Sequence, residues 1–257
     1  MTALSVNINA VAYLRNRRDL PWPSPTHIGR LALEAGASGL TVHPRPDERH
    51  IRRSDLPPLK ALVAEFKGAE FNIEGYPDTA FLDLVLAHHP HQVTFVPDAP
   101  TQATSDHGWD IEKHANLLTP ALRQMRAAGI RTSLFIEADP LAPIHAWEVG
   151  ADRVELYTGP YGSGYSNPEI AAQELDKLSQ VAEIAATVGL NQDTDRPPLG
   201  LNAGHDLTAE NLPALKRAIP HLDEVSIGHG LTAHALRTGY AQGVRDFLKA
   251  LSGSIQI

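Results

Sequence analysis

Cysteine is missing from the sequence altogether. Its absence excludes disulfide bonds, thiolate metal ligands and cysteine nucleophiles, and it is consistent with a reducing compartment. Long apolar runs are missing as well, since none approaches the roughly 18 residues that a membrane-spanning helix needs. The N-terminal residues MTALSVNINA lack the basic start and extended apolar stretch of a signal peptide. We therefore expect a soluble, cytoplasmic protein with no membrane partner.

Positive charge is scarce. The 22 lysine and arginine residues are outnumbered by 30 aspartate and glutamate residues, which gives a net charge of −8 with histidine neutral. A protein that neutralises nucleic-acid phosphates normally presents a basic face, so no nucleic-acid partner is expected. An anionic substrate would instead need a local basic pocket, and the densest basic segment is RPDERHIRR at 45–53.

Several catalytic motifs are also absent. The six lysines, at 60, 67, 113, 177, 216 and 249, all fall in segments predicted to be helical and none lies at the end of a predicted strand. This disfavours a Schiff-base mechanism through an enzyme lysine. The sequence has no G-x-S-x-G elbow and no Walker loop.

Short β-rich runs alternate with helical segments eight times. The predicted strands are Leu4–Ala10, Gly39–His43, Glu70–Gly75, Gln92–Pro97, Arg131–Ala138, Arg153–Gly159, Gly200–His205 and Glu224–His229. Strict alternation predicts a parallel sheet, and eight units in this length predict one closed (β/α)8 barrel, or TIM barrel, over residues 1–257. A doubly wound α/β sheet is the alternative, but the segment after the first strand, NINAVAYLRN, lacks the glycine-rich phosphate loop of that fold.

Capping residues indicate where the helices begin and end. Predicted starts are Ser24-Pro25, Ser54, Asp110, Asp139-Pro140, Asn167-Pro168 and Thr208, and one last helix is expected over 231–251. Two loops stand out. The polar segment 98–109 follows the fourth strand and is either a lid over the catalytic face or an ordinary surface loop. The segment 191–199 enters the seventh strand from the opposite face, so we expect it to be irrelevant to the chemistry.

Polar residues gather at the predicted strand ends, where a barrel carries its catalytic groups. His43 ends the second strand and Glu74 lies near the end of the third, while His205 ends the seventh. Imidazole exchanges protons near neutral pH, and a carboxylate at a buried strand end is paired or functional because burying it alone is costly. The alternatives are a structural role for His43, an internal ion pair of Glu74 with Arg45, and a zinc site formed by His43, Glu74 and His205. We expect no metal.

Candidate phosphate-binding groups surround these three. His205 and His229 each follow a glycine, whose backbone can approach an anion closely, although a Gly-His pair also suits a tight turn. Arg45 offers a fork that matches phosphate oxygens, and His50 lies in the same basic segment. Arg18, after the first strand, is a further candidate or a surface charge.

The ordered motifs VNINAVAYLRN, AGASGLTVHPRPDERHI, FNIEG, TSDHGWD, TSLFIEAD, ELYTGPY, LNAGHDLT and SIGH resemble the pyridoxine 5'-phosphate synthase family over nearly the whole chain. The resemblance implies condensation of 3-amino-2-oxopropyl phosphate with 1-deoxy-D-xylulose 5-phosphate, with release of phosphate and water. The imine forms between the two substrates, which agrees with the distribution of lysines. The resemblance also implies no cofactor, a closing loop after the fourth strand, and a homo-octamer built from dimers.

Residue roles follow from matching positions in the family's motifs. His43 and Glu74 match proton acceptors and His205 matches a proton donor. The remaining matches are substrate-binding positions. They are Asn7, Arg18, Gly228 and His229 for the aminoketone phosphate, and Asn9, Arg45, His50 and Thr104 for the deoxyxylulose phosphate, with Asp206 in the phosphate-binding region.

The chain departs from the family's common pattern in three places. The family often reads N-I-D-H where this chain has Asn7-Ile8-Asn9-Ala10, so a carboxylate becomes an amide and an imidazole becomes a methyl group. The loss of one hydrogen bond to a bound group costs about 0.5–1.5 kcal/mol, which weakens binding without abolishing it. The third departure is NAGHD for NAGHG, which puts Asp206 beside a predicted phosphate-binding loop.

Two other functions remain open at the level of sequence. One is an isomerase or epimerase acting on a single sugar phosphate, with His43 and Glu74 as its acid–base pair. The other is a non-catalytic binder of a phosphorylated ligand, suggested by the loss of an imidazole at Ala10.

Overall fold

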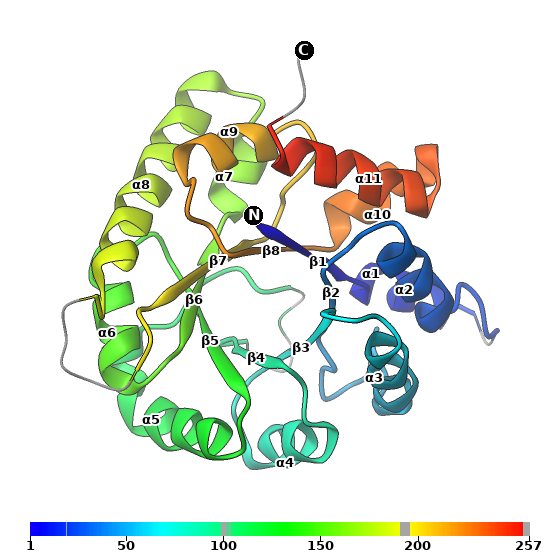
Figure 1. The fold of residues 1–257 in the computed structure, drawn as a ribbon, viewed down its shortest axis with the longest axis horizontal. Coiled ribbons are helices and arrows are strands. Elements are labelled where there is room, and N and C mark those ends of the chain that lie inside the picture. The colour runs from blue at the N-terminus through cyan, green and yellow to red at the C-terminus, as the bar shows by residue number, and fades with distance from the viewer. Residues whose placement is uncertain (19, 99–101, 103, 191–195, 254–257) are drawn as a thin grey trace.

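A closed barrel of eight parallel strands forms the centre of the computed structural model, which describes residues 1–18, 20–98, 102, 104–190 and 196–253. Each strand pairs with its neighbours in the sequence, and β1 closes the ring against β8. The strands are β1 (Ala3–Asn7), β2 (Gly39–Val42), β3 (Glu70–Gly75), β4 (Gln92–Phe95), β5 (Arg131–Ile136), β6 (Arg153–Tyr157), β7 (Gly200–Gly204) and β8 (Glu224–Ile227). The predicted (β/α)8 barrel is confirmed (Figure 1).

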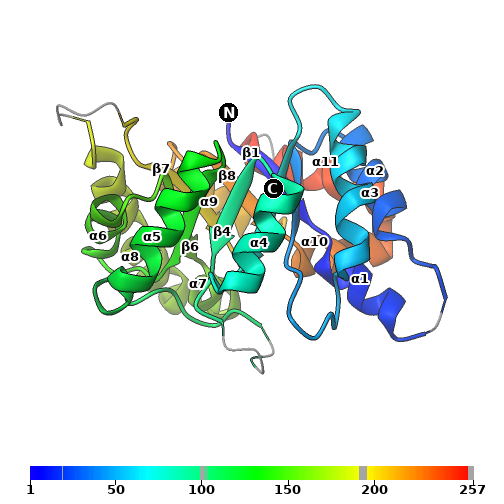
Figure 2. The same cartoon turned by 90° about the horizontal axis from the view of Figure 1, so that it is seen from below.

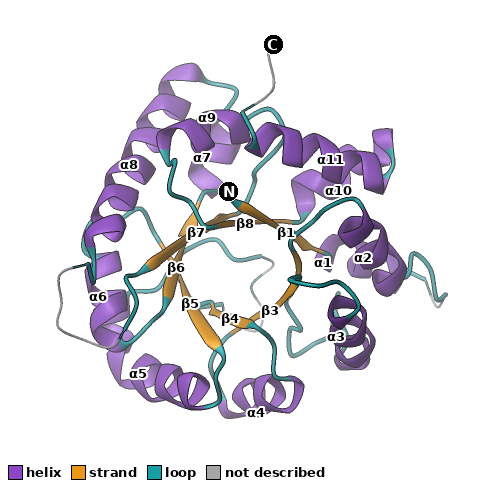
Figure 3. Ribbon diagram, in the orientation of Figure 1, coloured by secondary structure: helices purple, strands orange, loops and turns teal. Residues whose placement is uncertain are grey.

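Helices form the outer layer around this ring (Figure 3). They are α1 (Asn9–Asn16), α2 (Pro25–Glu34), α3 (Leu56–Ala64) after a 3-10 turn at Arg53–Asp55, α4 (Thr79–His88), α5 (Ile111–Ala127), α6 (Ala142–Val149), α7 (Gly159–Gly164), α8 (Pro168–Thr187), α9 (Leu212–Ala218), α10 (His229–Thr238) and α11 (Tyr240–Leu251). Within the described ranges, no helix is long and apolar enough to cross a membrane.

Several predicted helix starts are confirmed by hydrogen bonds. The Ser24 hydroxyl accepts a bond from the backbone N–H of His27, with a proline at the first helical position. Asp110 and Asn167 cap α5 and α8 in the same way. These side chains satisfy N–H groups that would otherwise lack partners at a helix start.

Other predicted boundaries are wrong. The helix expected over 231–251 is two helices, because Gly239 has φ +81°, a left-handed conformation that ends α10 and starts α11 on a new course. The helix expected from Ser54 begins at Leu56 after a single 3-10 turn, and the one expected from Thr208 begins at Leu212.

Most predicted strands extend too far at their C-terminal ends. The first strand stops at Asn7, so Asn9 and Ala10 belong to α1 rather than to β1. Similarly, His43, His205 and His229 follow their strands by one or two residues. His43 and His205 therefore lie at the start of the loops at the barrel mouth, whereas His229 is the first residue of α10.

Residues along the strands alternate between two buried regions, one apolar and one polar. Apolar residues such as Leu40, Ile73 and Val154 are buried in the large apolar cluster. Polar residues in the intervening positions are also buried and bond to one another, as in the link between the Ser5 and Thr41 hydroxyls at 2.7 Å. The barrel interior is thus unusually polar for this fold, whose interior is normally filled by branched apolar side chains. The buried polar side chains inside the barrel adjoin those at its mouth.

The βα loops gather at one end of the barrel, opposite the end where the N-terminal residue enters β1 (Figure 2). Of the predicted lid at 98–109, residues 99–101 and 103 lie outside the described residues. Of the second loop, 191–195 lie outside them.

Candidate active site

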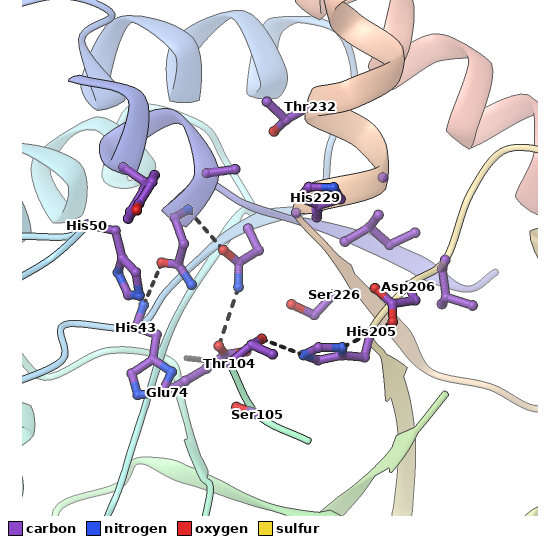
Figure 4. A pocket seen from close by; sticks show the side chains of 18 of the residues that line it. His43, His50, Glu74, Thr104, Ser105, His205, Asp206, Ser226, His229 and Thr232 are labelled. Atoms are coloured by element: carbon purple, nitrogen blue, oxygen red, sulfur yellow. Dashed lines mark hydrogen bonds and ion pairs between the residues drawn. The ribbon is translucent and has the colours of Figure 1, made fainter. Parts of the chain in front are cut away.

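A cavity of about 700 Å³ opens at this mouth and collects residues from distant parts of the chain. It is lined by all the predicted site residues except Arg18, namely Asn7, Asn9, His43, Arg45, His50, Glu74, Thr104, His205, Asp206, Gly228 and His229. Figure 4 shows the His43, Glu74 and His205 side chains around this shared space. Arg18 lies past the end of α1, is exposed, and does not line the cavity.

His43 is held in place by the start of α1. The Asn9 side-chain oxygen accepts a hydrogen bond from the His43 backbone N–H at 2.9 Å, and Asn7 in turn accepts one from the Asn9 N–H at 3.0 Å. Burial, with contributions from the nearby Arg45, His50 and Arg49, holds the pKa of His43 well below its usual value. His43 is therefore neutral at neutral pH, as a proton acceptor must be.

His50 shares this environment, with its ring centroid 6.0 Å from that of His43. Its Nδ1 accepts a hydrogen bond from the Ile51 N–H at 2.9 Å, which leaves Nε2–H as the donor in the neutral ring. Burial and the neighbouring Arg45 and Arg49 lower the pKa of His50 to about 4. His50 can thus donate a hydrogen bond to a bound anion from its uncharged form.

The loop that carries these histidines is clamped by the end of α1. Arg15 forms a buried ion pair with Asp55 at 2.6 Å and also donates to the His50 carbonyl at 3.1 Å. The Asn16 amide donates to the same carbonyl at 2.8 Å. The basic loop therefore has a fixed course before any ligand arrives.

Arg45 pairs with Asp98 rather than with Glu74, so the ion pair considered for Glu74 is not the one that forms. Both members of the Arg45–Asp98 pair are almost fully buried, and Arg45 also donates to the Gln102 carbonyl at 3.2 Å. The Ser105 hydroxyl donates to the same Asp98 carboxylate at 2.7 Å. This arrangement attaches the segment after β4 to the rim.

Glu74 accepts a hydrogen bond from the Asn7 amide at 3.3 Å. Burial is the main reason that the pKa of Glu74 is raised, and the nearby Asp98 carboxyl adds to the effect while Arg45 opposes it. A carboxyl group in this state can carry a proton at neutral pH and exchange it with a bound substrate.

Glu155 on β6 is a site residue that sequence reasoning missed. It lines the same cavity, is 4% exposed, and its Oε2 has no hydrogen-bond partner within the described part of the chain. Burial first, and then the Glu74 carboxyl, raise the pKa of Glu155 well above its usual value. The signal was available, because a glutamate inside the apolar run RVELY invites the same reasoning that singled out Glu74.

His205 lies on the opposite wall in a strained backbone. Its φ is +90° and that of Asp206 is +54°, values that residues other than glycine seldom adopt. The Thr158 hydroxyl lies 2.5 Å from the His205 carbonyl and 2.7 Å from that of Gly204, which holds this turn. The Tyr157 ring packs edge-on against the His205 ring at 5.3 Å, and the Thr104 hydroxyl lies 3.2 Å from Nε2.

Gly228 and His229 form the start of α10, which points its N-terminus at the cavity. Unpaired backbone N–H groups and the helix dipole make such a terminus a site for anions. The cavity therefore has two ends whose chemistry favours anions, one at the basic loop of Arg45 and His50 and one at the N-terminus of α10. Between them lie two carboxyl groups and two imidazoles that can exchange protons.

The described residues contain no group of three or more histidine, aspartate or glutamate side chains placed to hold a metal ion. Of the predicted lid, Thr104 and Ser105 line the cavity. Of the other loop, none of the described residues 196–199 does so.

Known proteins resemble this chain over nearly its whole length. The family model described as "Pyridoxal phosphate biosynthesis protein PdxJ" matches residues 4–253. A pyridoxine 5'-phosphate synthase of Brucella anthropi is 58% identical over 97% of this chain and 98% of its own. That of Mesorhizobium japonicum is 60% identical over 96% and 97%. Among solved structures, an archaeal ribulose-1,5-bisphosphate carboxylase/oxygenase has a TM-score of 0.65 at 12% identity, over 99% of this chain and 60% of its own, which shows the fold alone.

Proposed function

The chain belongs to the PdxJ family of pyridoxine 5'-phosphate synthases, enzymes of vitamin B6 biosynthesis, and on that premise we propose how its own residues carry the condensation. The observation that carries the proposal is the shared cavity of His43, Glu74 and His205 between two anion-binding ends. Two phosphorylated substrates bound at the two ends would meet over these side chains.

The two ends bind different substrates in this proposal. The deoxyxylulose phosphate lies at the basic loop with Arg45 and His50, near Asn9 and Thr104. The aminoketone phosphate lies at the N-terminus of α10, where Gly228 and His229 offer backbone N–H groups and Asn7 and Asp206 stand nearby. Arg18 would have to reach this ligand from outside the cavity as the structure describes it, so its role remains a prediction from the family alone.

Proton transfers follow from the electrostatics of the site. The amine of one substrate adds to the carbonyl of the other, and water leaves as the imine forms. His205 donates the proton to the departing oxygen. His43 is neutral and accepts protons from the condensing carbon skeleton. Glu74 and Glu155 have raised pKa values, so both can pass protons back and forth during ring closure.

The test is a two-substrate assay with purified protein. Pyridoxine 5'-phosphate and inorganic phosphate should appear only when both substrates are present, and His43→Asn should lower both rates by about 10²–10⁴-fold while leaving phosphate-ligand binding intact. Turnover of either substrate alone would favour the isomerase or epimerase alternative. Binding without turnover would favour the non-catalytic binder.

We propose further that the reaction needs no cofactor, because the carbonyl and the amine that react belong to the two substrates. A chelator in the assay should leave the rate unchanged. By the same family resemblance we propose a cytoplasmic homo-octamer built from dimers. Sedimentation analysis should give a particle of eight chains, and a dimer that does not assemble further would contradict this.

A further inference from the structure

His205 and Asp206 are adjacent residues whose side chains face one another at the cavity wall (Figure 4). The His205 Nδ1 is buried and has no hydrogen-bond partner among the residues described. It lies 3.8 Å from the Asp206 Oδ2, which is within ion-pair range but about 1 Å beyond a hydrogen bond. A buried nitrogen without a hydrogen-bond partner is energetically costly, so the unpaired His205 Nδ1 calls for a functional explanation.

The backbone brings the pair together at a cost in strain. Both residues have positive φ, and the Thr158 hydroxyl and the His205 carbonyl are 2.5 Å apart. Among residues other than glycine, aspartate and asparagine tolerate this region best. The family commonly has glycine at the position of Asp206, and glycine would satisfy the backbone without offering a carboxylate.

Among the described residues, the other groups in contact with the His205 ring are uncharged. Thr104 lies at Nε2, and Phe135 and Tyr157 pack against the ring. Burial raises the pKa of Tyr157, so its hydroxyl is neutral at neutral pH. Glu155, on the same strand as Tyr157, likewise has a raised pKa.

The Asp206 carboxylate is ionised. Its interaction with His205 lowers its pKa, and His229 contributes further. Its side chain is 45% exposed, so it has room to rotate toward the ring.

We propose that Asp206 is a positioning residue for His205, whose Nδ1–H it accepts in a hydrogen bond when the site is occupied. The bond fixes the neutral ring as its Nδ1–H tautomer and holds its plane, so that Nε2 faces the cavity, takes up the proton that the attacking amine releases and passes it to the departing oxygen. This inference rests on the proposed role of His205 as proton donor. It gives the Asp206 carboxylate a role of its own. A contact between the Asp206 backbone N–H and a phosphate group would not need this side chain.

The chemistry is that of a carboxylate orienting an imidazole, and only the proton on Nε2 moves to the substrate. Nδ1 keeps its proton throughout, as in serine-protease triads. Without the carboxylate, the neutral ring can place its proton on either nitrogen and can turn about its χ2 bond. A fraction of the molecules would then carry the proton on Nε2 or turn Nε2 away from the cavity, and could not take up and pass on the transferred proton.

The experiment compares Asp206→Gly with Asp206→Asn, both of which tolerate the left-handed backbone. Selective 15N labelling of histidine, with assignment by His205→Gln, reports which ring nitrogen carries the proton when inorganic phosphate is bound. We expect Nδ1–H in the wild-type protein and in Asp206→Asn, whose amide oxygen can still accept. Asp206→Gly should show a mixture of tautomers.

Kinetics give the second readout. Asp206→Gly should lower kcat by roughly 10- to 100-fold with KM for both substrates nearly unchanged, and Asp206→Asn should restore most of the loss. Asp106→Asn is the matched control. It removes a carboxylate that influences Tyr157 at the same mouth but is paired with His107 rather than with His205. It should behave as wild type.

Unchanged tautomers and unchanged kcat in Asp206→Gly would overturn the inference. A loss confined to KM would also overturn it, because Asp206 would then act in substrate binding alone. The nitrogen spectra need no turnover. If the wild-type protein fails to make product, the proposed function fails, whereas Nδ1–H in the wild type together with mixed tautomers in Asp206→Gly would still support the pairing.

Discussion

Glu155→Gln offers a direct test of the electrostatics of the cavity through the stability of the protein. Glu155 is 4% exposed, and burial together with the neighbouring Glu74 raises its pKa well above the usual value. The folded protein therefore retains a proton that the unfolded chain has already released. Unfolding releases that proton, so the contribution of Glu155 to stability falls as pH rises above the usual value for glutamate.

Glutamine keeps the shape of the side chain and removes the titration. The substitution should change stability little below pH 4.5, where both states of the wild-type chain are protonated at Glu155. At higher pH, one proton held in the folded state alone corresponds to a slope of about 1.4 kcal/mol per pH unit. The stability of Glu155→Gln relative to wild type should rise with this slope until native Glu155 itself ionises.

The measurement is urea unfolding of both proteins at pH 5, 6, 7 and 8. Glu183→Gln, an exposed glutamate on α8, is the matched control and should show no such slope. A constant difference between Glu155→Gln and wild type across this range would mean that Glu155 ionises in the native cavity as it does in the unfolded chain. The account of a protonated carboxyl pair would then be wrong.

Three further outcomes are expected. His43→Asn should lower kcat by about 10²–10⁴-fold, and because the pKa of His43 is lowered, the acidic limb of the wild-type rate profile that depends on it should lie below pH 6.5. Arg15→Met breaks the buried pair with Asp55 and should destabilise the protein by about 3–5 kcal/mol in denaturant titrations. Gly204→Ala puts a methyl group against the Glu155 carboxyl. It should therefore lower kcat clearly while changing the thermal unfolding midpoint only a little.

The barrel was predictable because each strand is short, buried on both faces and separated from the next by a helix with recognisable caps. The shared cavity of His43, Glu74 and His205 was also predictable, since His43 and His205 follow β2 and β7 and Glu74 is the last residue but one of β3, and a closed barrel brings all such positions to one mouth. This inference needed only topology. The exact strand ends did not matter, because a residue one or two positions past the strand still faces the same cavity.

Pairings between side chains were not predictable in the same way. The sequence suggested Arg45 as the partner of Glu74, but Arg45 pairs with Asp98 from the segment after β4. Several carboxylates lie within reach of Arg45 at the rim of the barrel. Which of them forms the ion pair depends on side-chain direction and burial, and the spacing of residues in the sequence indicates neither. The turn at Gly239 was missed for a related reason, since a glycine within a helical pattern is often tolerated.

Burial and the neighbouring charges give the histidines and carboxyl groups of the cavity different surroundings. Burial, together with the neighbouring Arg45, lowers the pKa values of His43 and His50, whereas His205 has the Asp206 carboxylate 3.8 Å from its Nδ1. Burial keeps protons on Glu74 and Glu155 between these walls. The two histidines thus have different surroundings within one cavity, and the difference follows from burial and neighbouring charges rather than from the residue types, because both are imidazoles.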